Sequence, residues 1–113
     1  MLFISLHRSD NLTFYPMNES MQSHFVGAEK GKFFNLNVAW NTGKVVDEKN
    51  LAKNQQSDLG NADYRLACDK VLLPVVREFK PDVIVISCGL DAGLHDPLGW
   101  SKVTAMQYAY MTQ

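Results

Sequence analysis

Residues 83–93 read VIVISCGLDAG, an apolar run that ends in a small-residue loop with one carboxylate. Four β-branched residues in succession predict a strand that is covered on both faces, as in a parallel sheet. Asp91 follows this strand directly, at the position where open α/β sheets carry ligands and acid or base groups. A turn role explains Asp91 equally well, because a loop aspartate accepts hydrogen bonds from nearby backbone N–H groups.

The size and charge of the chain exclude several classes of protein. It has 113 residues, of which 11 are basic and 12 acidic, and a formal charge of −1. This length fits one domain, and the balanced charge gives no electrostatic basis for binding nucleic acid or a membrane surface. Cys68 and Cys88 form no CxxC motif, which excludes a structural zinc finger and favours reduced thiols.

Two further strands are predicted upstream of residue 60. Residues 2–6 and 32–40 are rich in strand formers, and an irregular loop of about twenty residues, which runs to Gly27, lies between them. A loop of that length commonly contributes to a binding site. Residues 42–58 are polar and predict a loop insertion.

Helical periodicity follows this polar region. Apolar residues recur at three- and four-residue steps from 61 to 79, which predicts a helix that is capped by Asn61 and kinked at Pro74. A second helix is predicted over 104–112. Alternation of strands and helices indicates the α/β class, with the functional loops at the carboxyl ends of the strands.

Several polar side chains lie near predicted strand ends. Ser5 and His7 end the first strand, so they converge with Asp91 if the two strands run parallel. His7 is either a base or a hydrogen-bonded structural histidine. Cys88 is better explained as a small buried side chain than as a nucleophile, because no basic residue adjoins it.

The loop after Asp91 and the long first loop contain further candidates. His95 and Asp96 add polar groups close to Asp91, although an exposed histidine before an Asp-Pro turn explains them more simply. Four other loop residues suit either the walls of a narrow apolar slot or ordinary core packing: Phe14, Tyr15, Leu98 and Trp100.

The chain resembles the zinc-dependent histone deacetylases, most closely their class II members, in four ordered blocks. These are ISLHRSDNLTFYP (4–16), FFNLNVAWN (33–41), GNADYRLACDKVLLPVVREFKPDVIVISCGLDA (60–92) and DPLGWSKVTAMQYAYMTQ (96–113). The resemblance implies that residues 1–113 are a partial histone deacetylase domain, with part of an arginase/deacetylase α/β fold whose parallel sheet is flanked by helices. It implies hydrolysis of acetyl-lysine amides, in histones or other proteins, by a zinc-activated water.

The resemblance also implies roles for individual residues. Asp91 matches an aspartate ligand of the catalytic zinc, and the Ser5 side chain and Leu6 main chain match oxygen ligands of a structural potassium ion. Tyr15 matches the aromatic wall of the acetyl-lysine tunnel, and Leu98 matches an apolar residue at its rim. The implied partners are acetylated proteins and corepressor-type proteins, and the implied location is the nucleus, the cytoplasm or both.

The sequence departs from the family pattern in ways that bear on activity. The other zinc ligands, in a D-x-H motif, the paired histidines and the late transition-state tyrosine have no counterpart here. The chain alone is therefore expected to be inactive, because it has one zinc ligand and neither the base nor the oxyanion donor. A non-catalytic deacetylase-like interaction module is the alternative, and an unrelated α/β domain is a third. Phe33 stands where class II relatives usually carry glycine.

Overall fold

The computed structural model describes residues 1–44 and 56–113. They belong to two compact units, Met1–Gln55 and Gln56–Gln113. The predicted insertion at 42–58 lies largely outside the described residues. Within the described ranges, no helix is both long enough and apolar enough to cross a membrane.

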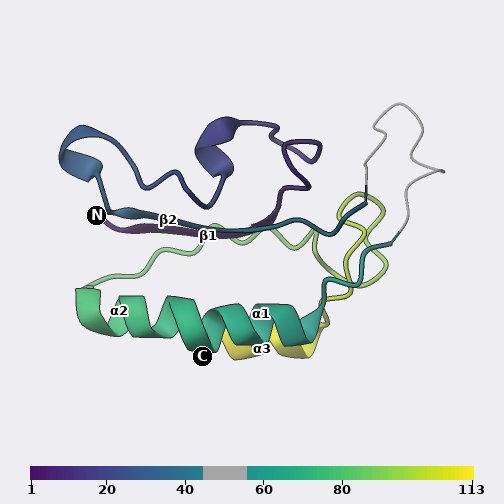
Figure 1. Ribbon diagram of the computed structural model, residues 1–113. Helices are drawn as coiled ribbons and strands as arrows, with labels where there is room; N and C mark the ends of the chain where they lie inside the picture. The colour runs from purple at the N-terminus through teal and green to yellow at the C-terminus, as the bar shows by residue number, and fades with distance from the viewer. Residues whose placement is uncertain (45–55) are drawn as a thin grey trace. The chain divides into compact units, whose positions relative to one another are not determined.

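The first unit contains a parallel pair of strands. β1 (Phe3–Arg8) and β2 (Asn35–Trp40) pair along their full length (Figure 1). Two single-turn 3-10 helices, η1 (Glu19–Met21) and η2 (Glu29–Gly31), interrupt the long connection between them. A parallel pair needs such a crossover, because a tight hairpin can join only antiparallel strands. Both predicted strands in this part of the chain are confirmed.

Asparagine side chains of β2 hold this connection in place. Asn35 Nδ2 donates to the Phe25 carbonyl at 2.9 Å, and Asn37 Nδ2 donates to the carbonyls of Ser20 and Gln22 at 2.9 and 3.1 Å. Asn37 is buried. Carbonyl groups of an irregular loop lack sheet partners, so buried amide donors stabilise this arrangement.

Phe33 has the backbone conformation that glycine adopts most easily. Its φ is 70°, in the left-handed region, and its side chain is 74% exposed. The Cβ of an L-residue is strained in that region, which gives the glycine of the class II pattern a physical reason. We expect Phe33→Gly to raise the free energy of unfolding by about 1 kcal/mol, measured by urea denaturation.

Lys32→Gly is the matched control for this substitution. Lys32 is also exposed but has an ordinary φ of −60°, so glycine there only increases the freedom of the unfolded chain. A loss of about 0.5–1 kcal/mol is expected. Equal losses in the two variants would contradict the assignment of strain to Phe33.

The second unit begins with a long helical run. It consists of α1 (Asn61–Ala67), the π-helical segment η4 (Cys68–Leu72) and α2 (Leu73–Phe79), which follow one another without a break (Figure 1). The predicted helix over 61–79 is confirmed. Pro74 lies in the first turn of α2, directly after the π turn, where the wider hydrogen-bond ring helps to accommodate a residue without N–H.

The predicted helix cap is wrong in one respect. Gly60 precedes α1, and its N–H donates to the Asp63 carboxylate at 2.9 Å. Asn61 instead bonds to Thr104 twice, with Nδ2 donating to Oγ1 at 3.0 Å and Oδ1 accepting from N–H at 2.8 Å. Thr104 precedes α3 (Ala105–Thr112), the second predicted helix, so Asn61 ties the beginnings of two neighbouring helices together.

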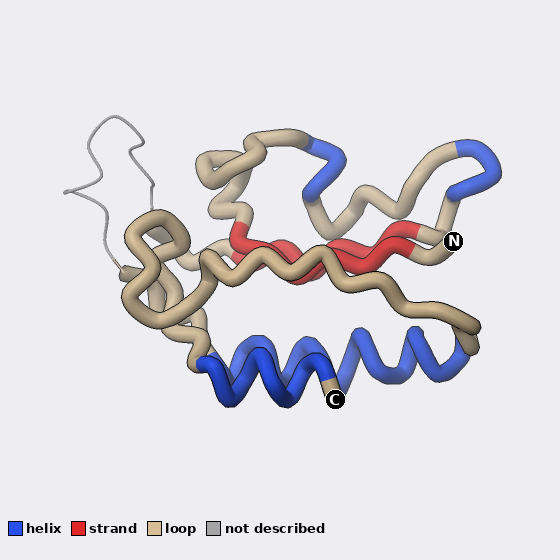
Figure 2. Tube along the Cα trace, turned by 180° about the vertical axis from the view of Figure 1, so that it is seen from behind, coloured by secondary structure: helices blue, strands red, loops and turns tan. Residues whose placement is uncertain are grey.

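The predicted buried strand over 83–87 does not form. This segment is drawn as loop in Figure 2, and Val83 to Ile86 are each between 56% and 89% exposed. A strand is defined by backbone hydrogen bonds to a neighbour, and the described part of the second unit supplies no neighbour for this run. The buried apolar side chains of the unit lie elsewhere, at Leu59, Tyr64, Ala67, Cys68 and Val103.

Candidate functional site

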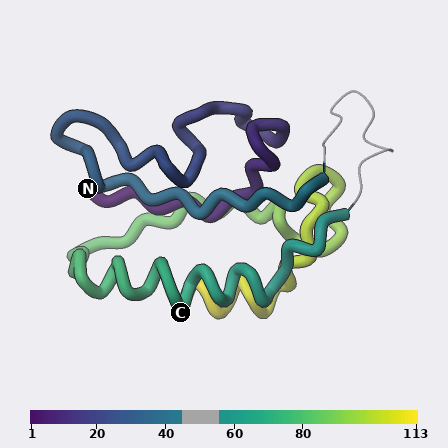
Figure 3. Tube along the Cα trace, viewed as in Figure 1, coloured from purple at the N-terminus to yellow at the C-terminus, as the bar shows by residue number. Residues whose placement is uncertain are grey.

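The loop around Asp91, residues 88–99, is fixed to the segment that leads into α3 (yellow-green in Figure 3). The Val103 N–H donates to the Ala92 carbonyl at 3.1 Å, and the Val103 carbonyl accepts from the Leu94 N–H at 2.8 Å. Val103 is itself buried. The Asp91 loop is therefore anchored in the unit even though the extended run before it is not part of a sheet.

Gly99 allows the two ends of the Asp91 loop to touch. A Cβ atom at Gly99 would lie 1.6 Å from the Asp91 carbonyl oxygen and 2.5 Å from its carbonyl carbon. Ordinary contacts between such atoms are more than 3 Å, so a side chain at this position would displace the Asp91 backbone. Glycine is needed here because of close approach, not because of a positive φ.

Two aspartates of this loop have different environments. The Asp96 carboxylate accepts from the N–H groups of Leu98 and Gly99 at 2.8 and 2.9 Å, which is the turn-forming role. Asp91 is exposed, and no hydrogen bond to its carboxylate is found within residues 1–44 and 56–113. Its oxygens are thus available to a ligand from outside the loop.

Two tyrosines, Tyr64 and Tyr108, share the electrostatic environment of Asp91, although no sequence pattern groups them with it. Burial, followed by the effects of Tyr108 and Asp91, raises the pKa of Tyr64 above its ordinary value. Burial, with Asp91 next in effect, also raises the pKa of Tyr108. Both phenols are therefore neutral at physiological pH, when they can donate hydrogen bonds but cannot act as anions.

In the described residues, Asp91 does not belong to a cluster of possible metal ligands. Within the described ranges, no group of three or more His, Cys, Asp or Glu side chains is arranged to hold a metal ion. A catalytic zinc site uses three protein ligands and one open position. The carboxylate suits the role of one such ligand, and the described residues do not supply a full set.

His7 orients the hydroxyl group of Ser5. His7 Nε2 lies 2.8 Å from the Met21 carbonyl, and since a carbonyl only accepts, Nε2 carries the proton. Nδ1 then accepts from the Ser5 hydroxyl at 2.8 Å. Both ring nitrogens are thus occupied, which fits the structural explanation of His7 better than the role of a base. The Ser5 oxygen keeps its lone pairs for a cation.

The Leu6 carbonyl points to the open edge of β1. The Phe3 N–H donates to the Phe34 carbonyl, just before β2, at 2.9 Å, and the Ser9 N–H donates to the Trp40 carbonyl, at the end of β2, at 2.8 Å. The backbone groups of the odd-numbered residues of β1 therefore face β2. Backbone groups alternate between the two edges along a strand, which turns those of Leu6 away from β2. The described sheet has no strand on that edge.

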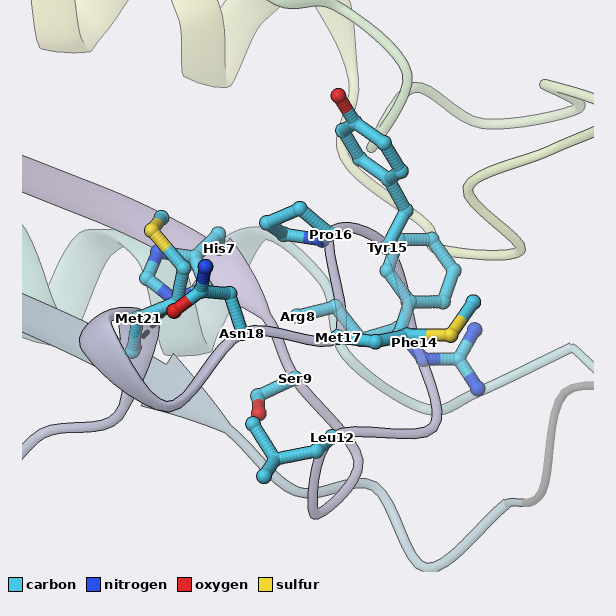
Figure 4. A pocket seen from close by; sticks show the side chains of 10 residues that line it. All are labelled: His7, Arg8, Ser9, Leu12, Phe14, Tyr15, Pro16, Met17, Asn18 and Met21. Atoms are coloured by element: carbon cyan, nitrogen blue, oxygen red, sulfur yellow. Dashed lines mark hydrogen bonds between the residues drawn. The ribbon is translucent and has the colours of Figure 1, made fainter.

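The predicted tunnel residues project outward within their own units. Tyr15 is 76% exposed, and Figure 4 shows its ring directed away from the other side chains that line a small surface pocket. Leu98, in the second unit, is also exposed, whereas Trp100 is half-buried. Cys88 is exposed, so its prediction as a buried filler is wrong, because the run before it is not covered.

Ser5 and His7 belong to the first unit and Asp91 to the second, and their convergence stays a prediction. His95 is exposed and has a φ of 71°, in agreement with its explanation as a loop residue.

Known proteins resemble the whole chain. Residues 1–113 match the family described as the histone deacetylase domain. Histone deacetylase 5 of Arabidopsis thaliana is 41% identical over 110 residues, which are 97% of this chain and 14% of that protein. Histone deacetylase 7 of Homo sapiens is 39% identical over an alignment of 114 positions, which covers 99% of this chain and 11% of that protein. The chain thus spans a small part of the length of these relatives.

Two solved structures also resemble nearly the whole chain. The histone deacetylase Clr3 superposes with a TM-score of 0.83 at 32% identity, covering 98% of this chain and 16% of that one. The HD domain of HDA15 superposes with a TM-score of 0.82 at 35% identity, covering 98% and 27%. These likenesses confirm the predicted partial α/β fold of the deacetylase type. By sequence and by structure, the chain belongs to the histone deacetylase domain family.

Proposed function

We propose that this chain provides part of the active site of a zinc-dependent lysine deacetylase, with Asp91 as one zinc ligand. The observation that carries the proposal is the contrast between two neighbouring carboxylates. Asp96 is engaged by the amides of its own turn, whereas Asp91 is exposed on an anchored loop without such bonds in the described residues. A ligand needs this combination of a fixed backbone and free oxygens.

Zinc, when bound, polarises the acetyl-lysine carbonyl. The residues of this chain would then hold the ion and the substrate. Asp91 offers a carboxylate oxygen, and Tyr15 and Leu98 offer exposed aromatic and apolar surface to the aliphatic part of the acetylated side chain. The acetylated lysines would belong to histones or other proteins of the nucleus, the cytoplasm or both.

The Ser5 hydroxyl and the Leu6 carbonyl suit a structural potassium site. Both are neutral oxygen donors, which a hard monovalent cation prefers. The bond from Ser5 to His7 fixes the hydroxyl proton away from the side on which a cation would bind, and the Leu6 carbonyl faces an open strand edge.

A zinc titration of this chain within a deacetylase domain that supplies the other zinc ligands tests the proposal. Asp91→Ala is expected to weaken zinc binding about tenfold or more, measured by calorimetry. Asp82→Ala, which removes another exposed carboxylate outside the loop, is expected to leave the affinity unchanged. Equal zinc affinities of the Asp91→Ala chain and the unchanged chain would exclude Asp91 as a ligand.

A non-catalytic interaction module is the second candidate. The exposed apolar run over 83–86 favours it, since such a surface is typical of sites that bind other proteins, including corepressor-type partners. Incubation with an acetyl-lysine peptide separates the two functions. With the chain inside a domain that supplies the remaining zinc ligands, the base and the oxyanion donor, zinc-dependent release of acetate supports the enzyme, whereas peptide binding without turnover supports the module.

A further inference from the structure

A buried ion pair lies where β1 enters the loop that carries Tyr15. Arg8 and Asp10 are each 5% exposed, and Arg8 Nε donates to the Asp10 carboxylate. Burying two charges is unfavourable unless they are paired and bonded further. The additional bonds of this pair therefore indicate what it holds in place.

Asp10 joins three parts of the first unit. Its carboxylate accepts from the N–H and from Oγ1 of Thr42, the latter at 2.8 Å, which ties it to the segment after β2. Its carbonyl accepts from Thr13 Oγ1 at 2.7 Å and from the Thr13 N–H at 3.2 Å. One side chain and one carbonyl thus connect the strand end, the loop and the chain beyond β2.

Arg8 holds the next residues of the loop. Its guanidinium lies 4.9 Å from the centre of the Phe14 ring, and the Phe14 N–H donates to the Ser9 carbonyl at 3.0 Å. A guanidinium above an aromatic face is attracted to it, more so when both are shielded from water. Phe14 therefore faces Arg8 while its neighbour Tyr15 projects away from the pocket residues (Figure 4).

The loop conformation needs this support. Asp10, Asn11 and Leu12 all have positive φ values, of 47°, 55° and 68°. Asp and Asn tolerate the left-handed region, but a leucine there is strained. Three such residues in succession would relax without bonds that hold both ends of the turn.

We propose that Arg8 and Asp10 are positioning residues, which set the orientation of Tyr15 through Phe14 and so determine how the aromatic wall receives an acylated lysine. The inference rests on the proposed function, because it deepens the role of Tyr15. Tyr15 itself makes the contact with substrate, and the ion pair acts behind it.

Arg8→Lys tests this in the full chain, because lysine keeps the charge but loses the planar group that stacks on Phe14 and bonds to Asp10. We expect the affinity for a fluorescent acetyl-lysine peptide to fall about tenfold. In a Tyr15→Ala background, Arg8→Lys is expected to have no further effect. Equal losses in both backgrounds, or no loss in the unchanged background, would overturn the proposal, since a general structural defect does not depend on Tyr15.

Amide hydrogen exchange provides a second measurement that needs no ligand. Arg8→Lys is expected to accelerate exchange over residues 11–17 about tenfold and to leave the amides of β2 unchanged. Unchanged exchange over 11–17 overturns the proposal even if the chain binds no peptide. Absence of peptide binding by the unchanged chain, together with accelerated exchange in the variant, supports the positioning role and counts against the proposed function.

Discussion

Gly99→Ala is expected to destabilise the second unit by about 3 kcal/mol, the upper end of what added atoms cost in a packed site. The added Cβ would overlap the Asp91 carbonyl at 1.6 Å, and backbone atoms cannot rotate away as a flexible side chain can. The Asp91 loop must therefore move as a whole. Urea denaturation followed by circular dichroism measures the loss.

Gly31→Ala is the control for this substitution. Nothing lies within 4 Å of a Cβ at Gly31, and its φ is not in the left-handed region. We expect it to be neutral or to stabilise by about 0.5 kcal/mol. If Gly99→Ala proved as mild as Gly31→Ala, the close approach of Gly99 to Asp91 would be absent from the folded protein.

Asn37→Asp is expected to destabilise the first unit by about 3 kcal/mol. The Asn37 amide donates to two carbonyls, and aspartate would replace this donor with a buried carboxylate that faces both acceptors. The connection between β1 and β2 would lose its central attachment. A fall in the urea midpoint at neutral pH, partly reversed in acid as the carboxyl is protonated, would be the signature.

Asn18→Asp makes the same chemical change where the opposite result is expected. The Asn18 oxygen accepts from the Ser20 N–H at 2.9 Å at the start of η1, and a carboxylate accepts that bond equally well. Stability within about 0.5 kcal/mol of the unchanged chain is expected. Comparable destabilisation by both substitutions would show that the loss at Asn37 does not come from its donor role.

Sequence patterns correctly predicted the helices and strands whose signal lies in residues close together along the chain. The helix over 61–79 follows from three- and four-residue periodicity, and β1 and β2 follow from their strand formers. The run over 83–87 carries an equally clear signal, but a strand also needs a partner, which composition cannot supply. Asn61 had a local cap available and bonds to Thr104 instead, a residue 43 positions away.

The sequence indicated which types of residue the candidate site contains, but it indicated less about how their side chains are arranged. Asp91 and Asp96 are both loop aspartates in sequence, and only the directions of nearby N–H groups separate the turn former from the free carboxylate. The proximity of Tyr64 and Tyr108 to Asp91 depends on how distant segments pack. Helical periodicity marked Tyr64 as a core residue and gave no sign of this relation.

The uncovered run over 83–86 has a consequence for handling the protein. Its β-branched side chains carry no charge, and short segments of this kind stack into cross-β fibres when their edges are free. Lys80, Pro81 and Asp82 come immediately before it, and residues of these types oppose such stacking. Fibre formation would therefore begin on the carboxyl side of Asp82. The residues at these three positions would set the protein concentration above which the chain aggregates.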